Sequence, residues 1–157
     1  MREELGRRLQ GKVALLGVGN PMWGDDGAGP ALIRGLEGRV PSLLVDGGES
    51  PESYWGKIVA YHPQAVLVVD AVNWGGEPGS VALLGKVEEQ GAPPTTHCVS
   101  LNLLLDLLRA GTRADVFVLG IQPKVVEFNA EMCPEVRRTV ELAGDLVAEL
   151  LAGDERW

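Results

Sequence analysis

The sequence predicts an α/β protein, a three-layer α/β/α sandwich built on a mostly parallel sheet of about five strands. Two observations lead to this prediction. Short apolar runs alternate along the chain with longer amphipathic stretches, as they do in repeated βα units. The apolar runs are also continuous, which is typical of parallel strands that helices cover on both faces.

Five segments are predicted as strands. Four are continuous apolar runs: VALLGV (13–18), SLLVD (42–46), AVLVVDA (65–71) and DVFVLGI (115–121). The fifth, GSVALLGKV (79–87), directly follows the turn-like sequence GGEP. We expect this fifth strand to be antiparallel and to lie at an edge of the sheet.

Four segments are predicted as the covering helices. Each has apolar residues three and four positions apart, and three of them end near glycine: 29–38, 51–62, 97–111 and 134–153. No linker, internal repeat or low-complexity tract separates these elements. We therefore expect a single domain over residues 1–157.

Composition narrows the possible partners and the compartment. The chain has 45% apolar residues and a formal net charge of -8, without any cluster of Lys and Arg, so nucleic acid and anionic membranes are poor partners. No apolar run approaches the roughly 20 residues needed to cross a bilayer. Cys98 and Cys133 lack the spacing of a disulfide framework or a zinc site. These features predict a cytoplasmic protein.

The glycine-rich bend GVGNPMWGDDGAG (17–29) follows the first predicted strand but does not suit a nucleotide. A dinucleotide fingerprint needs a small residue where Met22 stands, and Pro21 removes an amide donor that a pyrophosphate would use. The loop ends in Asp25 and Asp26, and two carboxylates repel phosphate. The bend is better suited to a cation or a neutral group.

Two other strands end in the same way as this bend. Asp46 closes the second predicted strand and Asp70 closes the third. The carboxyl ends of parallel strands share one edge of a sheet, so we expect Asp26, Asp46 and Asp70 to converge there. Three acids at one edge indicate a cation site.

A histidine is predicted to join these acids. In PPTTHCVSLNLLLDLL, Thr95 or Thr96 suits the N-cap position, which puts His97 in the first turn of the next helix. The helix dipole disfavours imidazolium there, so we expect a neutral ring with a nitrogen available to a metal. Cys98 follows directly but points about 100° away around the helix, so it is interpreted as a buried residue and not as a nucleophile.

Structural interpretations stand beside the functional ones. Asp25 and Asp46 also suit plain turn formers or caps, and a lone histidine at a helix start is commonly just polar surface. Four aromatic residues in or near the predicted edge loops either pack the loops or form a platform for a partner peptide: Trp23, Tyr54, Trp55 and Trp74.

Taken together, the motifs resemble those of the maturation endopeptidases of [NiFe] hydrogenases. The resemblance rests on GVGNPMWGDDGAG, VDGGES, VVDAVNWGGEPG, TTHCVSL and VLGIQP, which span about residues 13 to 137 in the family's order. Members of this family remove a short carboxyl-terminal extension from the hydrogenase large subunit once nickel has been inserted. Two departures concern Glu49, where the family usually has Thr, and Cys133, where it often has Ser.

The resemblance implies roles for four residues. Asp26, Asp70 and His97 match the family's metal-binding set, and Asp46 matches an aspartate linked to activity or positioning. It also implies that the nickel is supplied by the large-subunit precursor, with no resident organic cofactor. No HExxH helix is present, so a resident zinc-protease centre is not indicated.

Two other classes of function fit the same residues. One is a metal-dependent hydrolase of another small substrate, since a fold does not determine a reaction. The other is a non-catalytic module that checks metal insertion and uses the aspartates only for recognition. Turnover of unrelated substrates would indicate the first class, and precursor binding without cleavage would indicate the second.

Overall fold

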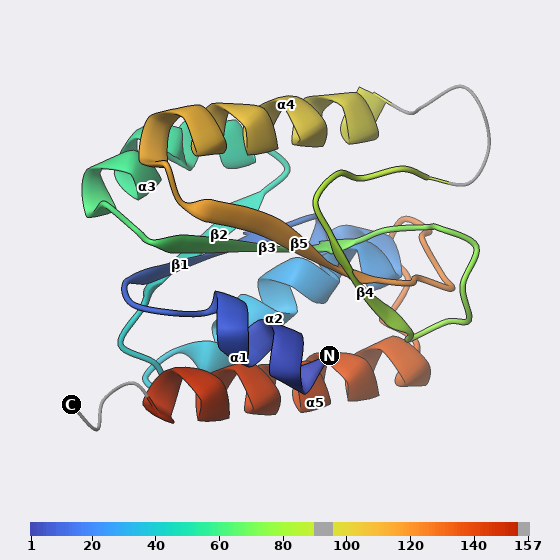
Figure 1. Ribbon diagram of the computed structural model, residues 1–157. Coiled ribbons are helices and arrows are strands. Elements are labelled where there is room, and N and C mark those ends of the chain that lie inside the picture. The colour runs from blue at the N-terminus through green and yellow to red at the C-terminus, as the bar shows by residue number, and fades with distance from the viewer. Residues whose placement is uncertain (90–95, 154–157) are drawn as a thin grey trace.

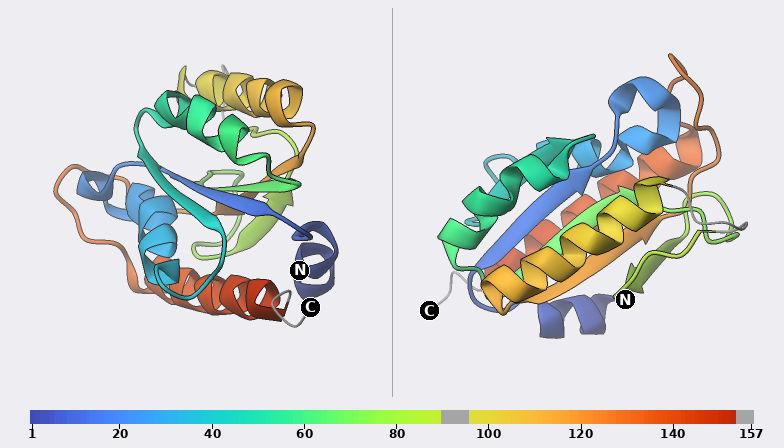
Figure 2. Two further views of the ribbon diagram at one scale, coloured as in Figure 1. Left: turned by 90° about the vertical axis from the view of Figure 1, so that its left-hand side faces the viewer. Right: turned by 90° about the horizontal axis from the view of Figure 1, so that it is seen from above.

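The computed structural model describes residues 1–89 and 96–153, which form three layers with a sheet in the middle (Figure 1). The five strands lie in the order β2-β1-β3-β5-β4. Two views at right angles show helices on both faces of this sheet (Figure 2). The predicted α/β/α architecture is confirmed.

The strands match the predicted segments. Four of them pair in parallel, with bounds Val13–Val18 (β1), Leu43–Gly48 (β2), Ala65–Ala71 (β3) and Asp115–Ile121 (β5). The short strand β4, Val81–Leu84, pairs antiparallel with β5 at the edge of the sheet, as expected from the turn before it. Strands β1 and β3 are buried along their whole length, which explains their uninterrupted apolar sequences.

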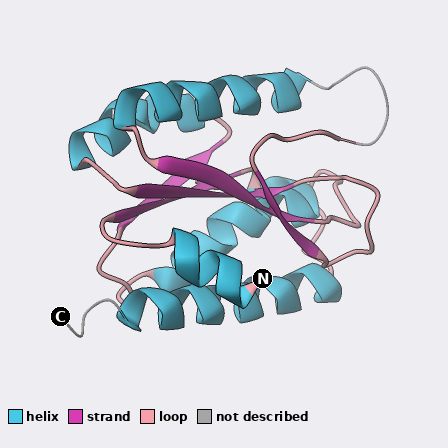
Figure 3. Cartoon of the chain, in the orientation of Figure 1, coloured by secondary structure: helices cyan, strands magenta, loops and turns pink. Residues whose placement is uncertain are grey.

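Helices cover the two faces in different combinations. Helices α3 (Trp55–Tyr61) and α4 (Thr96–Thr112) lie above the sheet in Figure 3, whereas α2 (Ala28–Leu36) and α5 (Pro134–Ala152) lie below it. Helix α1, Arg2–Arg8, also lies below the sheet and was not predicted. It packs there because Leu5 and Leu9 join the core cluster of α2 and α5. None of the helices in the described ranges is long and apolar enough to cross a membrane.

Alternate side chains of β3 enter two separate cores. Leu67 and Val69 belong to the core shared with α2 and α5, and Val66 and Val68 belong to the core shared with α3 and α4. Asp70 is next in the second series, so its side chain faces α4. The period of two along the strand thus decides which helix can meet each strand-end residue.

The chain reverses its direction of travel across the sheet between β1 and β3. It leaves β1 through α2 to reach β2 on one side, then passes through α3 to β3 on the other side. In doubly wound sheets the crevice at the carboxyl ends of such a strand pair is the usual ligand site. The loop after β1 and the end of β3 therefore define the place to look for a functional site.

Candidate functional site

Buried polar residues gather at the carboxyl edge of the sheet. Among the described residues, three polar or charged side chains are buried in the interior: Asp25, Asp70 and Gln122. Asp25 follows β1, Asp70 lies at the end of β3 and Gln122 directly follows β5. Buried polar groups are costly unless something pairs with them, so this concentration marks the edge as more than a loop surface.

Asp70 and His97 meet directly at this edge. The His97 Nε2 atom lies 2.9 Å from Asp70 Oδ2. The carboxylate is fully buried, whereas 43% of the His97 side chain is exposed. The adjacent Cys98 turns inward and its thiol donates to the Val87 carbonyl at 2.9 Å, which confirms its interpretation as a buried residue.

The surroundings of this pair shift both ionisation equilibria. Burial raises the pKa of Asp70 to about 6, although the hydrogen bond and charge of His97 act in the opposite direction. The hydrogen bond that the protonated His97 ring donates to Asp70 raises the pKa of His97 to about 9. The negative charges of Asp70, Asp26 and Glu89 also raise it, and burial acts against them. Near neutral pH the two side chains therefore form an ion pair.

The prediction that the His97 ring is neutral is wrong while the ring contacts Asp70. His97 does lie in the first turn of α4, as predicted. However, the buried carboxylate of Asp70 in direct contact outweighs the partial positive charge of the helix terminus, which is equivalent to only about half a unit charge. Nε2 is engaged with Asp70, and a metal would have to take the place of the proton between them.

Asp26 belongs to the same electrostatic neighbourhood. It lies in the 3₁₀ segment η1, Pro21–Gly27, and its Oδ2 atom accepts a hydrogen bond from the Asn20 backbone amide at 2.8 Å. Its negative charge contributes to the raised pKa values of both Asp70 and His97. Asp26 is half-buried.

One buried oxygen in this neighbourhood lacks a partner. Asp70 Oδ1 has no hydrogen-bond partner among the described residues, although no solvent reaches it. Within residues 1–89 and 96–153, no three His, Cys, Asp or Glu side chains are grouped as a metal-holding set. Asp70 and His97 are thus paired with each other, and the open lone pairs of Oδ1 suit a group that arrives from outside.

Asp46 does not join the other three residues. Its neighbour Leu44 packs with the core of α2 and α5, so Asp46 points to that face of the sheet, opposite to Asp70. There Asp46 is exposed and its Oδ2 atom lies 3.5 Å from the Arg34 guanidinium of α2. The expected convergence is therefore wrong for Asp46, because strand ends share an edge but not always a face. Its role in catalysis stays a prediction.

Unlike its neighbour Asp26, Asp25 is held by backbone amides of a distant segment of the chain. Its carboxylate accepts backbone hydrogen bonds from Lys124, Val125 and Cys133 at 2.7 to 2.8 Å, and the Cys133 thiol donates to it at 3.2 Å. Burial opposes ionisation, but these donors together hold the pKa of Asp25 below its usual value. Asp25 thereby joins the loop after β1 to the segment between β5 and α5.

Gln122 fixes a second loop, and sequence reasoning did not identify it as a positioning residue. Its Oε1 atom accepts hydrogen bonds from the Trp74 and Gly76 amides at 3.0 and 3.1 Å. Its Nε2 atom donates to the Asn73 side chain at 2.9 Å. The signal was a polar residue directly after a fully apolar strand, in the sequence VLGIQP.

The tight bend after β1 leads to a prediction about stability. Gly19 has a φ of +132°, and a Cβ atom there would lie 1.9 Å from the Asp26 carbonyl oxygen. We expect Gly19→Ala to lower the free energy of unfolding by about 3 kcal/mol, measured by urea titration. The alanine would strain the backbone at this positive φ and would also force the Asp26 carbonyl to move. Gly38→Ala is the control, since Gly38 also has positive φ but open space around it. Equal losses at both sites would contradict the prediction.

The Asp70–His97 pair leads to a prediction about pH. The pKa of His97 is raised from 6.5 to about 9, so its contribution to stability is complete below about pH 6.5 and lost as pH rises through about 9. The urea midpoint of the wild type should therefore exceed that of His97→Gln more at about pH 6.5 than at about pH 10. A difference between the two proteins that does not change with pH would refute this.

Comparisons with known proteins agree with the fold and point to one family. A family model described as hydrogenase maturation protease matches residues 32–150, a segment that includes Asp70 and His97 and begins after Asp26. The hydrogenase 3 maturation protease of Escherichia coli K12 is 36% identical over 130 residues, covering 81% of this chain and 83% of that protein. A putative hydrogenase maturation protease of Methanocaldococcus jannaschii is 26% identical over 163 residues, covering 96% and 94%.

Solved structures give the same result. The crystal structure of the [NiFe] hydrogenase maturation protease HycI from Thermococcus kodakarensis KOD1 matches with a TM-score of 0.87 at 30% identity. That match covers 95% of this chain and 99% of that chain. The solution structure of the endopeptidase HycI from Escherichia coli matches with a TM-score of 0.77 at 31% identity, covering 88% and 90%.

Proposed function

The chain belongs to the hydrogenase maturation protease family and is an endopeptidase, and from that premise we propose which peptide bond it cuts and when. Its substrate is a [NiFe] hydrogenase large-subunit precursor, from which it removes the carboxyl-terminal extension after nickel insertion. The observation that most supports this proposal is the contact of His97 with the buried Asp70 at the switch point of the sheet, with one carboxylate oxygen unpartnered among the described residues.

In this proposal the nickel on the precursor is the group that Asp26, Asp70 and His97 recognise. Carboxylate and imidazole are suitable ligands for a divalent first-row metal. Asp70 Oδ1 can accept the ion without losing a hydrogen bond to a described residue. His97 Nε2 can bind it only after its proton leaves, so nickel binding releases a proton.

If the substrate carries the nickel, cleavage depends on whether the precursor already holds nickel. Peptide hydrolysis adds water across the carbon–nitrogen bond, so it consumes no organic cofactor and none is proposed. The metal orients the precursor so that the bond to be cut lies beside the crevice. A precursor without nickel lacks that contact and is not positioned for cleavage. Cytoplasmic location, a single domain and the absence of nucleic-acid or membrane partners stay predictions from composition.

The test is to incubate the protein with hydrogenase large-subunit precursors, each prepared with and without nickel, and to measure the precursor mass. We expect loss of a carboxyl-terminal fragment only from a nickel-loaded precursor. His97→Asn should abolish that loss. His62→Asn is the matched control, because His62 is exposed at the end of α3 and asparagine tolerates its left-handed backbone. Cleavage of nickel-free precursor at the same rate would overturn the proposal.

A further inference from the structure

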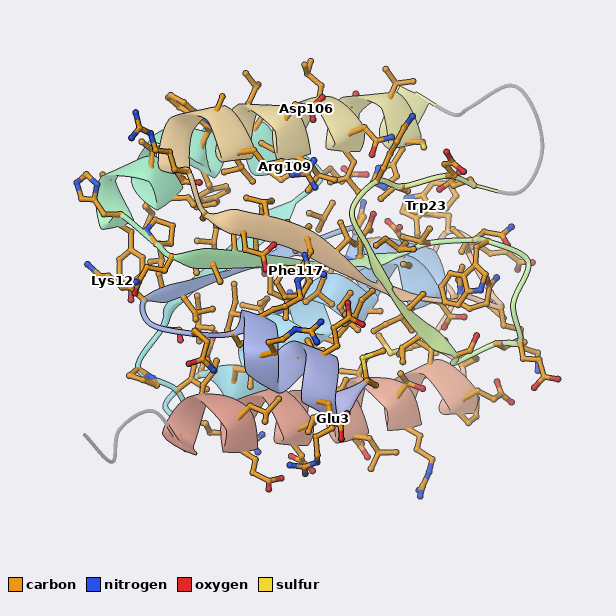
Figure 4. All side chains as sticks on the ribbon, in the orientation of Figure 1. Glu3, Lys12, Trp23, Asp106, Arg109 and Phe117 are labelled. Atoms are coloured by element: carbon orange, nitrogen blue, oxygen red, sulfur yellow. The ribbon has the colours of Figure 1, made fainter. Side chains whose placement is uncertain are left out.

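Four large apolar side chains are exposed together beside the candidate site. Met22 and Trp23 lie in η1, and Val126 and Phe128 lie in the segment that follows β5. Their exposed fractions are 50%, 41%, 49% and 64%. We call these four residues the aromatic platform. Figure 4 labels Trp23 on the side of the loops, opposite Lys12 at the other end of β1.

Specific contacts hold the two halves of the platform together. The rings of Trp23 and Phe128 meet edge to face with centroids 5.5 Å apart. The Asn129 amide donates to the Met22 carbonyl at 2.6 Å, and the Asp25 amide donates to the Val125 carbonyl at 2.7 Å. The fold therefore keeps an apolar surface in contact with water at a defined place, although burial would stabilise these side chains.

The other aromatic residues near the edge have intramolecular roles. The Trp55 indole N–H donates to the Leu107 carbonyl at 3.0 Å, which joins α3 to α4. Trp74 and Tyr54 pack against the core shared by α3 and α4. Of the two interpretations open for these residues, loop packing fits those three, and the platform interpretation stays a prediction for Trp23.

The platform adjoins an open cleft. The cleft has a volume of about 530 Å³ and runs between η1 and residues 129–132. Met22 belongs to both the platform and the cleft, and Arg34, Glu131 and Arg137 also line it. An apolar surface continuous with a polar-rimmed cleft is typical of a site that holds a polypeptide segment.

We propose that the aromatic platform binds the apolar surface of the hydrogenase large-subunit precursor that flanks its nickel. This inference rests on the proposed function. An endopeptidase must contact its polypeptide substrate around the bond that it cuts, and Trp23 is three residues from Asp26 within one short segment. A precursor whose nickel reaches Asp26 therefore lies across or beside the platform. A second copy of this chain seated there would block that approach.

The platform and the nickel contacts make separable contributions to affinity. Buried aromatic side chains dominate many protein interfaces, and this contribution needs no metal. The platform should therefore bind nickel-free and nickel-loaded precursor alike. Asp26, Asp70 and His97 should add affinity only when nickel is present.

The experiment measures Kd for nickel-free and nickel-loaded precursor, together with KM and kcat for cleavage. Phe128→Ser should weaken binding of both precursors about tenfold or more and raise KM, with kcat at saturation unchanged. Trp23→Ala should do the same. Asp70→Asn should lose only the extra affinity that nickel provides. The matched control is Leu142→Ser, an equally exposed apolar residue on α5, which should bind both precursors like the wild type.

The outcomes separate this inference from the proposed function. If Phe128→Ser bound both precursors as tightly as the wild type, the proposed role of the platform would be overturned, even if cleavage still required nickel. Because Phe128 is mostly exposed, this variant should fold even if Trp23→Ala does not. Sedimentation that shows a wild-type dimer dissociated by Phe128→Ser would reassign the platform to self-association. If the wild type cleaved nickel-free precursor as fast as nickel-loaded precursor while the platform variants still bound weakly, only the proposed function would be contradicted.

Discussion

We expect Asp70→Asn to lower kcat/KM for nickel-loaded precursor by about 100-fold or more, because in the proposed function it removes the charge that both nickel and His97 require. The carboxylate is fully buried, contacts His97 Nε2 at 2.9 Å and keeps its second oxygen free of described partners. An asparagine of the same shape presents an N–H group where one oxygen stood. The measurement is the rate of precursor shortening, followed by mass.

The same substitution should not reduce stability. Burial raises the pKa of Asp70 to about 6, so ionising this side chain near neutral pH works against folding. We expect the urea midpoint of Asp70→Asn at about pH 7 to stay close to that of the wild type, because removing the buried charge offsets the loss of the ion pair with His97. Asp46→Asn is the matched control, since that carboxylate is exposed on the other face, and should lose less than about tenfold in kcat/KM. An inactive protein that is also unfolded, or equal losses at both aspartates, would contradict this account.

Asp25→Ala should have a large effect on stability, lowering the free energy of unfolding by about 3 kcal/mol. It removes the common acceptor of three backbone amides and leaves at least the buried Cys133 amide without a partner. The loop after β1 would separate from the segment after β5, which displaces Asp26 and the aromatic platform together. Urea titration measures the first effect. Because the chain has four tryptophans, the second is followed by the part of the tryptophan fluorescence that Trp23→Phe removes.

The contribution of Asp25 to stability should also depend on pH, which provides a control for the effect of its charge. Its pKa is held below the ordinary value of 3.8, so its contribution to stability is complete above that value and is lost as pH falls through the folded-state pKa. The stability difference between wild type and Asp25→Asn should therefore shrink in acid. A difference that persists at about pH 2 would show that Asp25 acts by packing and not by charge.

Much of the fold and half of the site could be predicted from sequence because the relevant signals are local. Continuous apolar runs mark the buried strands. Asp26 lies in the bend that follows the first of them, and Asp70 lies at the end of the third. The placement of His97 followed from the N-cap residues before it, which put it in the first turn of a helix. The Asp70–His97 contact combines those signals.

What could not be predicted depends on contacts between distant residues. The hydrogen-bond partners of Asp25 lie 99 to 108 positions away in the chain, so its sequence context suggested only a turn former. The direction of Asp46 depends on the register of β2 against β1. The protonation of His97 depends on a single buried carboxylate, which outweighs the local effect of the helix. Helix α1 was missed because its charged sequence contains few apolar residues, of which Leu5 is buried.

We propose that this protein recognises nickel held by its substrate. Nickel K-edge X-ray absorption tests this recognition most directly. Spectra would be compared for the nickel-loaded precursor alone, with wild-type protein stopped before cleavage, and with His97→Asn. The account predicts that the wild type adds nitrogen and oxygen scatterers to the nickel shell and that His97→Asn adds fewer. A bound complex whose nickel spectrum is identical to that of the free precursor would contradict it.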